Sequence, residues 1–475
     1  MKKLSLIQLV GLVIGSIVGG GIFNLMKDMS SGASPAAVII GWIVTGLGMT
    51  MLAFCFQNLT AKRPDLDAGV YSYAKEGFGN YMGFNSAWGY WLSAWLGNVA
   101  YGTLLFSSIA YFVPIFENGS NLPSIIGASV MLWAVHLLIL QGVESASFIN
   151  TIITIAKLIP LCIFLVSALV AFKIGLFTAD FWGQLASTWG KGASIPSVIE
   201  QVKSTMLVTV WVFIGIEGAV VFSGRAKKKS DVGKATIIGL IAVISIYVLV
   251  TVLSLGVMTR SELQELKQPA MAYLLESIVG KWGAQLVNVG VIISVIGAWL
   301  AWTMFAGELP YEAAKQGSFP KLFSKENKNG APVNSLFFTN ILIQIFLFTL
   351  LFTEQAYNFA YSLATSAILI PYALTGFYQL KLSLQEKSTS EGAMKNILIG
   401  LFASIFGVWL VYAAGVTNFL LTMLLYAPGL IVYSMVQKEN DKPLFENIQE
   451  KIYASIIVIL FIVALVGLIS GMITI

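Results

Sequence analysis

The sequence predicts an all-α polytopic membrane protein with about 13 transmembrane helices. Hydrophobic residues make up 57% of the 475 residues and charged residues only 11%, whereas soluble domains carry about a quarter charged residues. The apolar residues also form blocks long enough to cross a bilayer, which takes about 20 residues of helix. These blocks lie near residues 4–26, 36–59, 82–113, 123–142, 148–172, 203–224, 235–258, 284–307, 335–353, 356–380, 396–413, 416–437 and 452–474.

The lysines and arginines predict how these helices are oriented. Of the 28 basic residues, 20 fall in segments on the N-terminal side of the membrane and 7 on the opposite side. Because cytoplasmic loops are enriched in Lys and Arg, we expect a cytoplasmic N-terminus and a multi-pass protein of the cell (inner or plasma) membrane. The densest basic cluster, residues 225–234, is expected to meet lipid headgroups of the bilayer. Nucleic acid is not an expected partner, since no soluble domain is large enough to bind it.

Several function classes lack the residues that they need. The one histidine, His136, and the two cysteines, Cys55 and Cys162, all lie in apolar blocks, so a metal site or a Cys–His nucleophile has almost no material. We expect His136 to be a packed or interfacial residue, and the protein to be no enzyme and to hold no cofactor or metal. A channel would need rings of charge or carbonyls. A receptor would need a signalling domain, whereas the longest loops have about 30 residues.

The first apolar block contains three consecutive glycines, Gly19, Gly20 and Gly21, in the stretch GSIVGGGIF. Glycine readily leaves helical geometry, and an unpaired backbone group in hydrocarbon costs several kcal/mol. We therefore expect a helix break that faces protein or water. Its freed N–H groups can receive a carboxylate near the positive end of the following helix. The alternative is that these glycines only allow close helix packing.

The sixth apolar block repeats this feature. Its stretch VWVFIGIEGAVVFSG carries Gly215 and Gly218 in mid-span, and its IEGAVVF resembles IVGGGIF of the first block. Interrupted helices at matching positions of two halves indicate the binding site of a secondary transporter. We therefore expect an inverted five-plus-five helix repeat with broken first and sixth helices. The expected parts are a ten-helix core at residues 1–380, with repeats at about 1–175 and 200–380, and three additional helices at 381–475.

Two ionisable residues are predicted at membrane depth, while the other acids are assigned to loops or membrane ends. Glu217 lies in the interrupted sixth block, where a carboxylate is expensive and is by default a functional hypothesis. It would carry a proton or sense a cationic substrate; otherwise it is a neutral acid hydrogen-bonded between helices. Lys157 would provide a fixed or titratable positive charge in place of a metal cation, which makes sodium coupling unexpected. Its alternative is a lysine satisfied by the carbonyls of a broken helix.

Three aromatic residues and one amide are further candidates. Trp211 lies in the sixth block, Trp302 in the eighth and Tyr90 in the third. Together they would bind a guanidinium or ammonium group by cation–π contact, although each taken singly is more typical of a core residue. Asn98, also in the third block, needs a protein or ligand partner at that depth.

Four stretches carry a resemblance to a known family. They are GSIVGGGIF, WVFIGIEGA, AWTMFAGELPYEAAKQGSFPKLFSKENKNGAP and RPDLDAGVYSYAKEGFGNYMGF. Together they resemble the amino acid–polyamine–organocation (APC) superfamily, in particular its basic amino acid/polyamine antiporter branch. Two sequence stretches, QNLTAKRPDLDAGVYSYA and GFNSAWGYWLSAWLGNVAY, are most similar to bacterial arginine/ornithine antiporters. The likeness runs from Leu4 to about Lys381.

This resemblance implies a set of site residues. The substrate carboxylate would meet the first interruption and the α-amino group the backbone of the sixth, with Glu217 as gate and Trp302 stacking on the side chain. The distal basic group would meet the third span, and the tenth span would add a polar contact. The implied substrate-binding residues are Gly19, Gly20, Gly21, Tyr90, Ser93, Ala94, Asn98, Trp211, Ile214, Gly215, Trp302 and Ser362, and the implied gating or charge-sensing residues are Glu217 and Lys157.

The sequence also departs from the family pattern. Arginine/agmatine relatives have a serine at the position of Gly20 and a small residue at the position of Lys157, whereas proton-coupled members have a lysine close to the latter. The common core has twelve spans rather than thirteen. We expect alternating-access exchange of arginine for ornithine, with a homodimer possible. The alternatives are an amino acid/amine exchanger, for histidine/histamine or lysine/cadaverine, and a proton-coupled importer of a basic amino acid.

Overall fold

The computed structural model describes residues 5–66, 70–142, 146–189, 194–216, 229–352, 355–386 and 392–473. Within these ranges the regular secondary structure is helical apart from an isolated β-bridge between Glu326 and Pro332, and turns and loops connect the helices. Nine helices in the described part are long and apolar enough to cross a membrane. The predicted all-α polytopic membrane class is therefore confirmed, and every predicted block contains helix.

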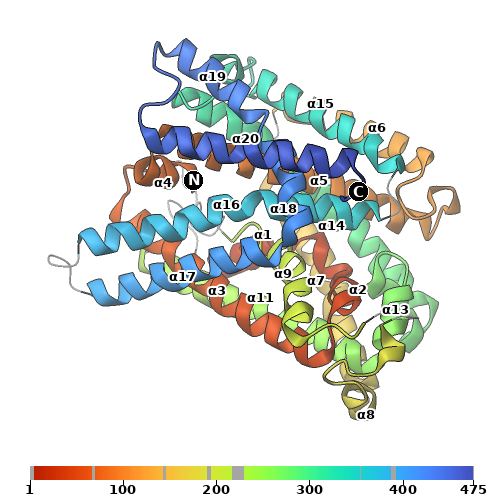
Figure 1. The fold of residues 1–475 in the computed structure, drawn as a ribbon. Helices are drawn as coiled ribbons and strands as arrows, with labels where there is room; N and C mark the ends of the chain where they lie inside the picture. The colour runs from red at the N-terminus through yellow and green to blue at the C-terminus, as the bar shows by residue number, and fades with distance from the viewer. Residues whose placement is uncertain are drawn as a thin grey trace. The chain divides into compact units, whose positions relative to one another are not determined.

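The helices follow one another as Figure 1 labels them. In chain order they are α1 (Leu6–Ile17), the 3-10 turn η1 (Gly20–Phe23), α2 (Leu25–Gly32), α3 (Pro35–Lys62), α4 (Val70–Phe78), α5 (Asn80–Ala110), α6 (Leu122–Leu140), α7 (Ala146–Ala171), α8 (Ile174–Thr178), α9 (Val198–Trp211), α11 (Lys229–Val257), α12 (Arg260–Glu265), α13 (Ala270–Val279), α14 (Lys281–Lys315), α15 (Val333–Thr349), α16 (Ala356–Gln385), α17 (Ala393–Ala413), α18 (Gly415–Tyr426), α19 (Gly429–Glu439) and α20 (Ile448–Ile469).

The structure locates the helix ends within two of the predicted blocks. In the sixth block, which was predicted to be interrupted, helix α9 ends at Trp211 and the chain turns over residues 212–216. The twelfth block is two helices, α18 and α19, separated at Ala427 and Pro428. Proline lacks the N–H that a continuing helix would need. The loops also contain short helices that hydropathy alone does not detect, such as α4 and α12.

The chain divides into two compact units, each gathered from distant segments. The first unit comprises residues 1–53, 101–126 and 145–299, and the second comprises residues 54–100, 127–144 and 300–475. Both therefore depend on contacts between residues far apart in the sequence.

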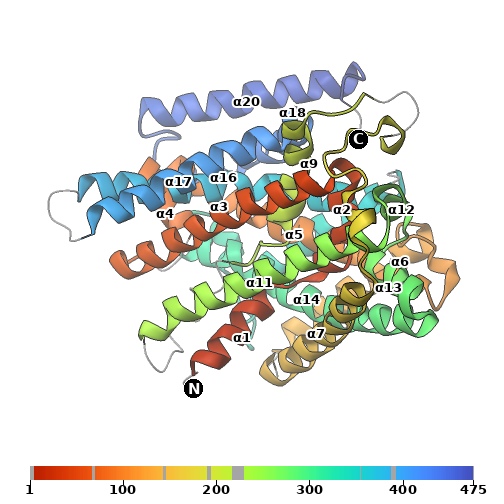
Figure 2. The ribbon, with the colours of Figure 1, turned by 90° about the horizontal axis from the view of Figure 1, so that it is seen from below.

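In the first unit, α1 lies beside α11 (Figure 2). A Cβ atom at Gly239 of α11 would lie 2.9 Å from Cβ of Val13 on α1, so the two helices approach closely only because residue 239 is glycine. Leu9 and Ala235 extend the same apolar contact toward the start of α1. This packing holds α1 just before its C-terminal end.

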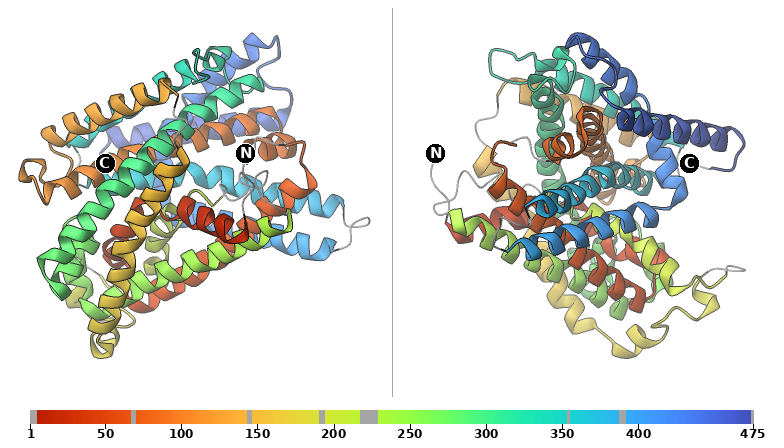
Figure 3. Two further views of the ribbon diagram at one scale, coloured as in Figure 1. Left: turned by 180° about the vertical axis from the view of Figure 1, so that it is seen from behind. Right: turned by 60° about the vertical axis from the view of Figure 1, so that its left-hand side comes forward.

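In the second unit, α16 and α17 form an antiparallel pair (Figure 1), which Figure 3 shows in cyan and light blue from two further directions. A Cβ at Gly400 would lie 2.6 Å from the backbone nitrogen of Leu380, and one at Gly407 would lie 2.9 Å from Cα of Ala373. Small residues let helices approach in this way within membranes. Gly376 faces the backbone of Ala403 similarly.

Polar side chains join α6 to α15 in the same unit. Nδ2 of Asn340 lies 3.0 Å from Nδ1 of His136, and Gln344 bonds both Ser129 and Trp133. His136 is buried among aromatic rings. The prediction that it is a packed residue is confirmed.

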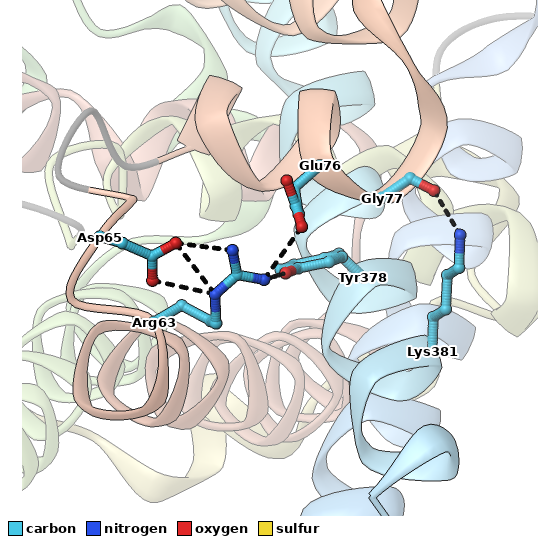
Figure 4. A network of polar contacts seen from close by, with 6 residues as sticks. All are labelled: Arg63, Asp65, Glu76, Gly77, Tyr378 and Lys381. Carbon is cyan, nitrogen blue, oxygen red and sulfur yellow. Dashed lines mark hydrogen bonds and ion pairs between the residues drawn. The ribbon is translucent and has the colours of Figure 1, made fainter.

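A network of polar contacts fixes α4 to α16 (Figure 4). Arg63 donates from Nη1 to Glu76 at 3.2 Å and to the Tyr378 hydroxyl at 2.8 Å, and from Nη2 to Asp65 at 2.7 Å. The guanidinium lowers the pKa of the Asp65 carboxyl. Lys381 adds a bond of 2.6 Å to the carbonyl of Gly77. Residues of the family-like stretch RPDLDAGVYSYAKEGF therefore fix α4 to α16.

Candidate functional site

The predicted interruption of the first apolar block is present. Helix α1 ends at Ile17, Gly19 has an extended backbone, and a single 3-10 turn from Gly20 to Phe23 precedes α2. The first N–H groups of a helical turn have no partner within it. Gly20 and Gly21 are the first residues of this turn, so their N–H groups lie at its N-terminal end, where a carboxylate is electrostatically favoured.

The sixth block is interrupted after α9. Trp211 is the last residue of this helix, and residues 212–216 form turns rather than a continuing helix. Gly215 has φ of +106°, a conformation that residues with a Cβ rarely adopt. The N–H of Ile214 still bonds the carbonyl of Val210 at 3.1 Å, and the backbone leaves helical geometry at Gly215, within the predicted interruption.

The two interruptions meet within the first unit. A Cβ at Gly21 would lie 2.8 Å from Nε1 of Trp211 and 2.9 Å from Cγ1 of Val212. The ring of Tyr101 lies 6.0 Å from the ring of Trp211, and its hydroxyl would lie 3.2 Å from a Cβ at Gly19. The glycines therefore serve close packing as well as unwinding, so both readings of this stretch describe part of the structure.

Lys157 binds the carbonyl groups that α1 exposes where it ends. Its Nζ donates to the carbonyl of Gly15 at 2.7 Å and to that of Val18 at 2.6 Å. The residue is only 5% exposed. The contacts match the alternative in which carbonyls of a broken helix satisfy the lysine, and they place its positive charge at the negative end of α1.

Tyr247 was missed by the sequence analysis and bridges both interruptions. Its hydroxyl on α11 lies 3.1 Å from the carbonyl oxygen of Ile17 and 2.8 Å from that of Val212. The residue is fully buried against Trp42 and Phe213. The sequence contained a signal for this residue, because a tyrosine in the apolar run ISIYVLVTVL needs a hydrogen-bond partner for its hydroxyl when it is buried.

Replacing Tyr247 with phenylalanine should lower the transport rate about tenfold. The change keeps the ring but removes the donor shared by two buried carbonyls, and a buried hydrogen bond is worth about 1 kcal/mol or more once the unpaired group is included. The rate is measured in reconstituted vesicles. The matched Tyr412→Phe change, on a side chain 59% exposed on α17, should leave the rate unchanged. Equal rates for both variants would contradict this role.

Asp28, which the sequence analysis did not single out, is a buried acid that follows the first interruption. It lies on α2, is 4% exposed, and accepts a hydrogen bond of 2.7 Å from Nδ2 of Asn24. Oδ1 of Asn24 accepts from the backbone N–H of Ala270 at 3.2 Å. Gln264 donates to the carbonyl of Ser30 at 2.9 Å. These contacts tie α2 to the α12–α13 segment within the first unit.

In the second unit the structure brings together the predicted residues of α5 and α14. The rings of Tyr90 and Trp302 both pack on Phe305, with centroid distances of 5.2 Å and 5.4 Å. Nδ2 of Asn98 lies 3.3 Å from the hydroxyl of Thr303. Ala94 is buried like Asn98, and Ser362 on α16 is half-buried.

Two of the predicted site residues on α5 each have a buried oxygen without a hydrogen-bond partner among the described residues. These oxygens are Oγ of Ser93 and Oδ1 of Asn98, in side chains that are at most 2% exposed. Buried polar atoms are nearly always paired, so these two oxygens are available to accept from a ligand. They lie five residues apart on α5.

Some predicted residues do not enter this geometry. Glu217 and Gly218 lie outside the described residues. Among the residues that are described, no group of three or more His, Cys, Asp or Glu side chains is placed to hold a metal ion.

Comparison with known proteins covers nearly the whole chain. Residues 4–462 match the protein family described as "Amino acid permease". An "Arginine/ornithine antiporter" of Pseudomonas aeruginosa is 48% identical over 100% of this chain and 98% of its own. One of Latilactobacillus sakei is 46% identical over the same shares. The "Arginine/ornithine antiporter ArcD1" of Lactococcus lactis subsp. cremoris is 42% identical over 98% of this chain and 90% of its own.

Proposed function

Since the chain belongs to the amino acid permease family, we propose that it is a secondary-active antiporter that exchanges arginine for ornithine by alternating access. The observation that carries this proposal is the full-length similarity, at 42–48% identity, to relatives named arginine/ornithine antiporters. A multi-pass chain with interrupted helices is typical of such transporters. The unequal distribution of basic residues supports a cytoplasmic N-terminus in the cell membrane.

In the first unit, we assign main-chain groups to the amino acid part of the substrate. The N–H groups around Gly19, Gly20 and Gly21 would receive the α-carboxylate. The main-chain groups of the second interruption, at Trp211, Ile214 and Gly215, would receive the α-ammonium group. This assignment explains why both helices break there, since backbone groups exposed at membrane depth need partners.

In the second unit, we assign side chains to the distal basic group. Asn98 and Ser93 offer unpartnered oxygen acceptors to the N–H groups of a guanidinium or an ammonium. Trp302 and Tyr90, which share Phe305 as a neighbour, offer aromatic faces to a cation. The small side chain of Ala94 leaves space on α5, and Ser362 adds a hydroxyl from α16.

Lys157 favours exchange that does not depend on a proton gradient. Its Nζ already binds two carbonyl groups, and ammonium is the form that donates to both most strongly. We assign it the part of a fixed cation at the end of α1. A lysine that gives up its proton during the cycle would instead make the protein a proton-coupled importer, with Glu217 as a second carrier.

Substrate competition tests the proposed exchange pair. Purified protein in ornithine-loaded vesicles takes up labelled arginine while unlabelled ornithine, lysine, histidine, agmatine, cadaverine or histamine is added outside. We expect ornithine to inhibit uptake as strongly as arginine, and the three amines, which lack the carboxylate, to inhibit weakly. Strong inhibition by histamine with histidine, or by cadaverine with lysine, would replace the pair by an amino acid/amine pair.

A further inference from the structure

Helix α16, which carries Ser362, has a proline in its interior, Pro371. Proline has no N–H, so it cannot bond the carbonyl four residues earlier, and its ring crowds that carbonyl. The affected carbonyl belongs to Ala367. Within a membrane such a group needs another donor, because no water is there to supply one.

Tyr426 provides that donor from a different helix. Its hydroxyl, on the last residue of α18, donates to the carbonyl oxygen of Ala367 at 2.7 Å. The side chain is 1% exposed, so it is placed by packing as well as by this bond. The hydroxyl therefore fills the gap in the hydrogen-bond ladder that Pro371 opens.

Helix α5 leaves room for this hydroxyl at one residue. A Cβ at Gly89 would lie 2.6 Å from Cζ of Tyr426 and would overlap its hydroxyl oxygen, and it would lie 2.8 Å from the Ala367 carbonyl oxygen. Only glycine fits at this position. The next residue is Tyr90, one of the proposed substrate contacts, so the hydroxyl of Tyr426 touches α5 and α16 at the same point.

The neighbouring residue of α18 is held in turn by α5. Nε1 of Trp88 donates to the carbonyl of Leu425 at 2.9 Å. The Trp88 ring would lie 3.0 Å from a Cβ at Gly429, where α19 begins. Near each of two prolines, Pro371 inside α16 and Pro428 between α18 and α19, an aromatic side chain of another helix thus donates to a main-chain carbonyl.

From these contacts we propose that Tyr426 is a positioning residue for substrate binding, a role that rests on the proposed function. Its hydroxyl sets the spacing of α5 and α16, and with it the places of Tyr90 and Ser362. The additional C-terminal helices thereby act on the substrate through α18. A residue that only stabilises the fold would change the melting temperature and leave substrate affinity unchanged.

A double-mutant cycle tests the proposal, using Tyr426→Phe, Pro371→Ala and both changes together. We expect Tyr426→Phe to raise the KM for arginine exchange about tenfold with a smaller change in kcat. In the Pro371→Ala background a main-chain N–H is restored to the Ala367 carbonyl, so the same change should raise KM by less than about threefold. The control Tyr412→Phe should leave KM unchanged.

An unchanged KM in Tyr426→Phe would overturn the proposal, and so would an equal rise in both backgrounds. If Pro371→Ala does not fold, the single variant decides: a raised KM at a near-normal melting temperature supports the proposal, and a lowered melting temperature alone rejects it. Failure of the proposed exchange itself is separate, because the unmodified protein would then take up no arginine.

Discussion

Gly21→Ala should lower arginine exchange by up to about 100-fold. The added methyl would lie 2.8 Å and 2.9 Å from two atoms of the Trp211 ring and 2.9 Å from Cγ1 of Val212. Overpacking of this kind costs about 1–3 kcal/mol and occasionally more, and each 1.4 kcal/mol is a factor of ten in rate. Since both partners lie at the second interruption, the clash displaces from each other the two backbone segments proposed to bind the substrate. Exchange is measured in vesicles, and folding by size-exclusion profile.

Gly11→Ala is the matched control on the same helix. No atom lies within 4 Å of a Cβ at Gly11, which is exposed on α1. Alanine is favoured over glycine in a helix by up to about 1 kcal/mol, so this variant should exchange normally and melt at the same temperature or slightly higher. Normal exchange by Gly21→Ala, with a monodisperse profile, would show that the close contact between the interruptions is dispensable.

Lys157→Met should reduce exchange to the background of empty vesicles. The change preserves an apolar chain of similar length but leaves the carbonyls of Gly15 and Val18 without the donor that Nζ provides. A hydrogen bond to a charged group contributes about 1.5–3 kcal/mol, and two such bonds are lost at the end of α1. The favourable interaction of the lysine's positive charge with the negative, C-terminal end of α1 is lost as well.

Two further variants separate the parts that Lys157 plays. Lys157→Gln retains two N–H donors without the charge, so partial exchange there would identify hydrogen bonding as its main contribution. Lys173→Met, at an exposed lysine of the same unit, should exchange normally. If Lys157→Met keeps full activity, the lysine has no part in shaping the end of α1 that is proposed to bind the substrate.

The fold class was predictable because hydropathy reports burial in lipid directly. The exact helix ends were less predictable from hydropathy, because they depend on main-chain geometry rather than on composition. The mostly apolar run around Trp211 continues for a dozen residues past the exact end of α9, and Pro428 divides a block that is mostly apolar on both sides. The helices α4 and α12 depend on tertiary contacts, such as those of Arg63, that composition does not reveal.

The candidate site was predictable only in part. The glycines and Lys157 stood out because they are unusual at membrane depth, and the structure joins them at the end of α1. Tyr247 was overlooked because a tyrosine in an apolar span is common, and its importance comes from two carbonyls more than 30 residues away from it in the chain. The burial of Asp28 was not predicted because it follows the apolar block, although neighbouring helices bury it on α2.

The most direct test of the account is whether arginine entry requires internal ornithine. Labelled arginine uptake is followed into vesicles that are either empty or loaded with ornithine, each with and without an inward proton gradient. The account predicts uptake only into loaded vesicles, at a rate that the gradient does not change. Gradient-driven uptake into empty vesicles would contradict obligatory exchange and would make the protein a proton-coupled importer.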